Sequence, residues 1–147
     1  MMENKSTEKL LNRLNKIESE SQLTKFINSS SPQENNYLLS EYILKICKAK
    51  GYNKSTIIQN SDIYRTYGYE ILNGKKSPSR DKLLQICIGN GFTLDEANRT
   101  LTIAKLGILY AKYPRDSILI YAMNNNLSII DINILLDQHN FKPLGES

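Results

Sequence analysis

Side chains that could bind a polyanion gather in the middle of this 147-residue chain. The interval 32–92 holds nine Lys or Arg against five Asp or Glu, whereas the intervals 1–31 and 93–147 carry net charges of +1 and −1. Guanidinium and ammonium groups bind phosphate oxygens, and a guanidinium also pairs with the edge of a guanine base. The candidates for contact with base edges are Tyr64, Arg65, Thr66, Tyr67 and Glu70. The candidates for contact with backbone phosphates are Lys54, Lys75, Lys76 and Arg80.

Residue types suited to catalysis or metal binding are sparse. The single histidine, His139, has Asp137 nearby but no nucleophile in a recognisable arrangement, so we expect it at the surface. Cys47 and Cys87 each stand among apolar residues at helical spacing, which is typical of small buried side chains in a reducing compartment. The sequence has no Cys/His ligand spacing, phosphate-binding loop or Gly-rich dinucleotide turn. We therefore expect no catalytic residues, no metal site, no cofactor and no enzymatic activity.

Helix signals run through the chain and predict an all-α fold. Apolar residues recur at three- and four-residue intervals in the runs 39–47, 83–88, 94–104 and 118–123, and no alternating strand pattern is present. Pro32 and Pro114 stand where a first helical position tolerates proline, and Gly51 stands where a helix ends. Pairs typical of helix N-termini occur at Ser31/Glu34, Thr93/Glu96 and Ser128/Asp131.

Two short helices are predicted inside the basic interval, over residues 55–61 and 64–72. The second ends at Asn73-Gly74, residue types that tolerate positive φ, and a basic loop containing Pro78 follows. When two helices are joined by a tight turn, the second can enter the major groove of DNA, where its first turn meets base edges. Lysines beyond the end of that helix would lie beside phosphates and position the protein without reading sequence.

The run at residues 69–79, YEILNGKKSPS, resembles the XRE, or lambda-repressor-like, helix-turn-helix family. That family typically shows the end of a helix followed by Asn-Gly, basic residues, Pro and a polar helix cap. The strings RTYGY at 65–69 and PSRDKLL at 78–84 look like a subgroup of small bacterial regulators in that family, and the likeness continues at 109–110, 115–116 and 133–136. The resemblance implies a five-helix DNA-binding core with C-terminal helical additions.

Three positions depart from the family pattern. Ile58 stands where the family usually has a small alanine, Asp62 stands at the turn glycine, and Gly68 stands where a branched apolar residue anchors the second helix. A glycine inside a helix costs about 1 kcal/mol relative to alanine. Gly68 allows either the close approach of another helix or, as we expect, the packing of a tyrosine ring beside it, and we expect Tyr69 to pack inward.

The chain divides into an amphipathic helical leader (1–31), a helix-turn-helix core (32–92) and a C-terminal helical extension packed on the core (93–147). In the leader, Leu10, Leu14 and Ile17 are in helical register, and this stripe could dock on its own domain or on a partner. No apolar run is long enough to span a bilayer, and charged residues occupy the place of a signal peptide's apolar core. We expect a cytoplasmic protein without membrane contact.

The favoured function is that of a transcriptional regulator that binds double-stranded DNA, as a homodimer because one short helix reads few base pairs. The alternative is a protein-interaction adaptor or regulatory subunit that recognises a signalling or phage-defence partner through the same helices. Asp62 and Glu70, acids beside the supposed DNA face, favour that alternative.

Overall fold

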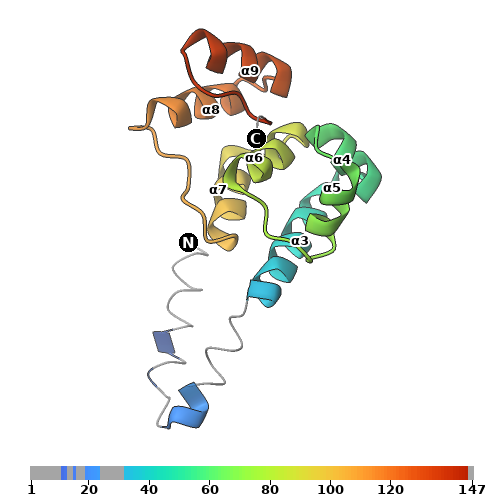
Figure 1. Ribbon diagram of the computed structural model, residues 1–147, viewed down its shortest axis with the longest axis vertical. Coiled ribbons are helices and arrows are strands. Elements are labelled where there is room, and N and C mark those ends of the chain that lie inside the picture. Colours follow the sequence, from blue (N-terminus) through green and yellow to red (C-terminus); the bar gives the residue numbers. More distant parts are fainter. Residues whose placement is uncertain (1–10, 13–14, 16–18, 24–31, 146–147) are drawn as a thin grey trace.

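Helices make up the main body of the protein. The computed structural model describes residues 11–12, 15, 19–23 and 32–145. Between residues 32 and 145 it contains seven helices and no strand, which confirms the predicted all-α fold (Figure 1). They are α3 (Pro32–Ala49), α4 (Lys54–Ser61), α5 (Arg65–Leu72), α6 (Arg80–Gly89), α7 (Leu94–Ile103), α8 (Pro114–Asn124) and α9 (Ile129–Gln138). The leader positions Leu10, Leu14 and Ile17 lie outside the described residues.

Side-chain hydrogen bonds cap two of the helix N-termini that the sequence predicted. The Thr93 hydroxyl accepts a hydrogen bond from the Glu96 N–H at 3.1 Å, and the Glu96 carboxylate accepts one from the Thr93 N–H at 2.9 Å. The Ser128 hydroxyl accepts from the Asp131 N–H at 3.1 Å. These bonds satisfy amide groups that have no partner within the helix. The third predicted pair depends on Ser31, which lies outside the described residues.

Helices α3 to α7 pack around a common apolar core. α3 contacts α5 and α7, and α6 contacts α4 and α7. Leu39, Ile43 and Cys47 of α3 are buried at the predicted spacing. Gly51, two residues after the end of α3, has φ +80°, a backbone conformation that favours glycine. The predicted boundary between the core and the C-terminal extension falls between residues 92 and 93, just before α7. Because α7 packs on α3 and α6, this helix belongs to the same core.

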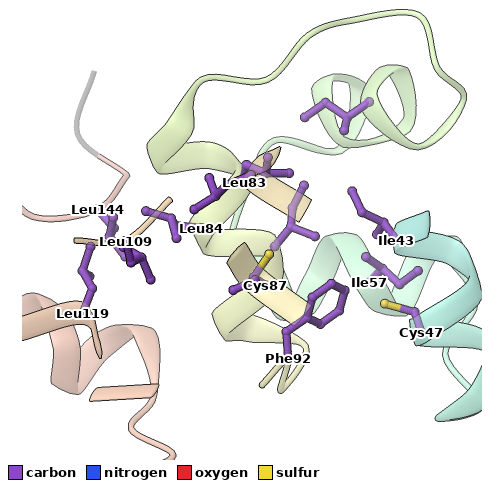
Figure 2. Close-up of a cluster of buried hydrophobic side chains, with 14 of the residues drawn as sticks. Ile43, Cys47, Ile57, Leu83, Leu84, Cys87, Phe92, Leu109, Leu119 and Leu144 are labelled. Atoms are coloured by element: carbon purple, nitrogen blue, oxygen red, sulfur yellow. The ribbon is translucent and has the colours of Figure 1, made fainter. Parts of the chain in front are cut away.

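The core extends from these helices into the C-terminal part of the chain. Leu109, Leu119 and Leu144 gather beside Leu84 of α6, whereas Cys87 of the same helix lies on the side of α3 and α4 (Figure 2). All five side chains are 5% exposed or less. α6 thus has apolar partners both in the α3–α7 body and in the segment that carries α8 and α9.

Two Arg-Asp dipeptides join the C-terminal helices to α6. Arg80-Asp81 begins α6, and Arg115-Asp116 lies in the first turn of α8. The Arg80 guanidinium donates to both carboxylate oxygens of Asp116 at 2.9 Å, and Arg115 donates to those of Asp81 at 2.9 and 3.0 Å. Paired contacts of this kind fix relative orientation as well as distance. The first turns of α6 and α8 are therefore held to each other by two reciprocal ion pairs.

Candidate functional site

α5 has a buried face and an exposed first turn. Ile71 and Leu72 are 1% and 2% exposed, because they pack into the core between α3 and α4. Tyr64, the residue that precedes the helix, is 86% exposed, and Arg65 and Thr66 are exposed beside it. The structure therefore brings three of the five predicted base-contact residues together at one end of α5, accessible to a partner.

The side chain of Ile58, in α4, fills the space beside Gly68. A Cβ atom added at position 68 would lie 2.7 Å from Cγ1 and 2.9 Å from Cγ2 of Ile58, which are shorter than any normal contact. The prediction that a tyrosine ring fills this space is wrong. The large residue in α4 and the missing side chain in α5 compensate each other, so the two helices pack closely.

Tyr67 and Tyr69 are half-buried and pack against the core. The inward packing expected for Tyr69 is thus confirmed, and Tyr67 shares it. The Arg65 guanidinium carbon lies 5.7 Å from the ring centroid of Tyr69, and the Lys76 ammonium lies 5.8 Å from that of Tyr67. Each ring therefore holds a cation over its face, which limits the conformations of both long side chains.

Charges near the C-terminal end of α5 are partly paired. Glu70 is half-buried and its carboxylate lies 3.6 Å from the ammonium of Lys76. The neighbouring Lys75 is exposed. The pairing offsets the acid that stands among the predicted base contacts, but it also means that Lys76 would exchange Glu70 for a phosphate rather than simply add a contact.

Lys54 reaches across to the same end of α5. Its ammonium donates to the side-chain oxygen of Asn73 at 2.6 Å, and the residue is half-buried. It also borders an open groove of about 460 Å³ at the junction of α3 and α4, which is lined by Leu44, Lys48, Gly51, Tyr52, Asn53 and Lys54. Lys48, which the sequence analysis did not single out, is therefore a second ammonium on this groove.

The loop that carries Lys75 and Lys76 is anchored on α3. Gly74, at φ +76°, lies so close that a Cβ atom there would be 3.2 Å from the Cα of Tyr37. The Ser77 hydroxyl donates to the side-chain oxygen of Asn36 at 2.7 Å, and Pro78 is buried. The basic turn therefore has a defined position relative to α5. Of the predicted Asn-Gly pair, Gly74 has positive φ and Asn73 does not, its φ being −94°.

Arg80 does not lie where the predicted phosphate contact requires. Besides both oxygens of Asp116, its guanidinium donates to the backbone carbonyls of Gly107 and Ile108 at 2.9 Å. The hydrogen bonds to Asp116 are also the main reason that the pKa of Arg80 is raised. With four hydrogen bonds made inside the chain, this guanidinium supports the α7–α8 connection, and the assignment of Arg80 to a phosphate is corrected accordingly.

Two buried amides support the turn between α4 and α5. The Gln85 side chain donates to the carbonyls of Ser61 and Asp62 at 3.2 and 3.3 Å, and the Asn90 side chain donates to the Ser61 hydroxyl at 3.1 Å and to the Ile57 carbonyl at 3.3 Å. Asp62 itself has φ +54°, a left-handed conformation that aspartate adopts more readily than most residues other than glycine. Sequence reasoning missed both amides, because buried partners distant in sequence leave no local signal.

Metal-binding clusters are absent from the residues that the structure describes. No group of three His, Cys, Asp or Glu side chains in residues 32–145 could hold a metal ion. Both cysteines are buried and free, as predicted, and burial raises the pKa of Cys47 to about 11 and that of Cys87 to about 12. Thiols in this state are poor nucleophiles. His139 is exposed at the end of α9.

In the part of the chain that the structure describes, no helix combines the length and the apolar character that crossing a membrane requires. Comparison with known proteins found no family model, no curated protein and no solved structure that matches this chain.

Proposed function

We propose that this chain is a DNA-binding transcriptional regulator that inserts the first turn of α5 into the major groove. The observation that carries the proposal is the exposure of Tyr64, Arg65 and Thr66 at one end of a helix whose other face is fixed in the core. A guanidinium on such a turn can pair with a guanine edge, and a threonine methyl or a tyrosine ring can contact a thymine methyl. Arg65 would supply most of the base discrimination.

Cations near the C-terminal end of α5 would position the duplex. Lys75 and Lys76 follow the helix in an anchored turn, and Lys54 and Lys48 border the groove at the start of α4. Ammonium groups beside a recognition helix bind the phosphates of the two DNA strands and release counterions. Because Lys76 already contacts Glu70, we expect Lys75 to contribute more than Lys76 to the salt dependence of binding.

The proposal includes a homodimer. One eight-residue helix can meet only a few base pairs, and regulators of this design gain selectivity when two copies read half-sites one helical turn apart. An enriched operator should therefore be a palindrome or a near palindrome.

The test is selection from a randomised duplex pool with the full chain, followed by affinity measurements on the enriched sequence at several salt concentrations. Arg65→Ala should lose about 1 to 3 kcal/mol of discrimination at one base pair and keep most nonspecific binding. Lys75→Ala should weaken binding to all sequences and lower the slope of log affinity against log salt by about 1. The matched control is Lys112→Ala, since Lys112 is exposed in the connection between α7 and α8, outside α5, the basic turn and the groove lined by Lys48 and Lys54.

The absence of an enriched motif together with an affinity that does not change with salt would refute DNA binding.

A second candidate, recognition of a protein by the same surface, is favoured by the 86% exposed ring of Tyr64 next to the acid Asp62. Aromatic rings at this exposure commonly become buried anchors in protein interfaces. A stoichiometric protein partner that Tyr64→Ala releases would support that candidate in place of DNA.

A further inference from the structure

The helices α8 and α9 expose an apolar surface that nothing in the described part of the chain covers. Ile130 and Ile134, one turn apart on the solvent face of α9, are 73% and 51% exposed, and Tyr121 of α8 is 57% exposed. A groove of about 380 Å³ between the helices is lined by Ser117, Ile118, Tyr121, Leu135 and His139. We call Ile118, Tyr121, Ile130, Ile134 and Leu135 the α8/α9 patch. Clustered apolar exposure of this kind marks an interaction site.

The exposed charges on α8 and α9 themselves are acidic. Arg115 and Asp116 are both engaged in the ion pairs with α6, which leaves Asp131 and Asp137 as the exposed charges of α8 and α9. These two acids lie three residues before and after Ile134, and so flank it about 60° to either side around α9. Asp137 stands in the last helical turn, where the helix dipole disfavours an acid. A cationic, apolar partner would therefore complement this surface.

The chain itself contains a segment with that chemistry. In residues 5–17, Leu10, Leu14 and Ile17 have i, i+4, i+7 spacing, and Lys9, Arg13 and Lys16 repeat the same spacing one position earlier. As a helix, this segment would carry a basic edge directly beside an apolar stripe. Apolar side chains flanked by cations match isoleucines flanked by aspartates, the usual complementarity when an amphipathic helix binds a groove.

We propose that residues 5–17 dock on the α8/α9 patch of their own chain. Residues 18–31 separate this segment from α3, and with the helical turn described at Ser19–Leu23 these fourteen residues can span up to about 40 Å, more than the roughly 30 Å diameter of a small domain. A tether of this length keeps the segment at an effective concentration near the millimolar range, so a modest affinity is enough for docking. The acidic border of the patch selects the basic leader over an uncharged apolar segment.

Cysteine cross-linking in the full-length protein tests this contact. The pair Leu14→Cys with Ile134→Cys should form a disulfide within one chain under mild oxidation, about tenfold faster or more than the matched pair Leu14→Cys with Gln59→Cys. Gln59 is exposed on α4, and the native thiols are buried with raised pKa, so they do not compete. Asp137→Lys should slow the cross-link several-fold, and adding Lys16→Glu should restore it.

A second measurement does not depend on the cysteine variants. Hydrogen exchange of the full chain should show protected amides in residues 5–17, and Ile130→Asp should remove that protection while amides of α3 and α6 stay protected. Equal cross-linking of both pairs, or no protection in residues 5–17, would overturn the proposal. A disulfide that forms only between two chains would also overturn it and identify a second copy as the occupant, and faster cross-linking to Leu38→Cys would place the leader on α3 instead.

Discussion

The contact between Ile58 and Gly68 yields a prediction that tests how α5 is held. In the wild-type chain, replacing Gly68 by alanine should gain about 1 kcal/mol of helix propensity. The added methyl group would lie 2.7 Å from Ile58 Cγ1, however, and overpacking of this kind costs about 1 to 3 kcal/mol. Since Ile58 is β-branched and 5% exposed, it has little freedom to turn away. The net effect of Gly68→Ala should therefore be a loss of stability of about 1 kcal/mol.

The effect of Gly68→Ala on stability should change sign when Ile58 is replaced by a shorter residue. Ile58→Ala alone should cost about 2 to 5 kcal/mol, because it leaves a cavity between α4 and α5. In that background Gly68→Ala keeps its helix propensity and fills part of the cavity, so it should stabilise by about 1 kcal/mol. The coupling free energy between the two positions should thus be about 2 kcal/mol, within the range measured for residues in contact.

Urea unfolding followed by far-ultraviolet circular dichroism measures these values and suits a chain without tryptophan. The matched control is Gly107→Ala, since a Cβ atom at position 107 would meet no atom within 4 Å. This substitution should have the same small effect with either residue at position 58. If the effects of Gly68→Ala and Ile58→Ala on the free energy of unfolding were additive, the two positions would not be coupled, and the account of α5 packing would be wrong.

Four further predictions concern other buried contacts. Gly89→Ala should lower the melting temperature by about 5 to 10 °C, because the added Cβ atom would collide with the backbone carbonyl oxygen of Asn60, which cannot turn away. Arg80→Ala should cost about 3 kcal/mol by leaving Asp116 buried without its cation. Burial alone raises the pKa of Asp116, but hydrogen bonds from Arg80 and from the backbone outweigh it, so the folded pKa lies below the ordinary value. The resulting stability is present above about pH 4 and lost as the pH falls through the folded pKa, and Asp116→Asn should flatten this acid limb in unfolding measurements from pH 2 to 7. Cys87, with a pKa of about 12, should not react with a thiol reagent at pH 8 until the chain unfolds.

Local rules were sufficient to predict most of the helix boundaries. Capping by Thr93 and Ser128 depends on residues three positions away, and the left-handed conformation of Gly51 depends on the backbone at that residue alone. Signals of this range are complete within a short stretch of sequence. The exposed first turn of α5 followed in the same way, since apolar positions such as Ile71 indicate which face is buried.

Contacts between distant segments could not be predicted in this way. Arg80 follows two lysines in a basic loop, and its type suggests a phosphate partner, but Asp116 lies 36 positions away and no local feature indicates the pairing. The partner of Gly68 depends on how α4 crosses α5, which is why Ile58 and not a tyrosine occupies that space. Lys48 gains its place on a groove only when the end of α3 meets the start of α4.

The reciprocal Arg-Asp pairs have a consequence for how this chain could be shortened or recombined. A chain ending before Pro114 would remove Arg115 and Asp116 together, so Arg80 and Asp81 would each lose a partner at the start of α6. The Leu84 side of the same helix would also lose the apolar cover that Leu119 and Leu144 provide. The C-terminal helices are therefore not a detachable module, and a functional transplant of α8 and α9 to another scaffold would have to carry the first turn of α6 with it.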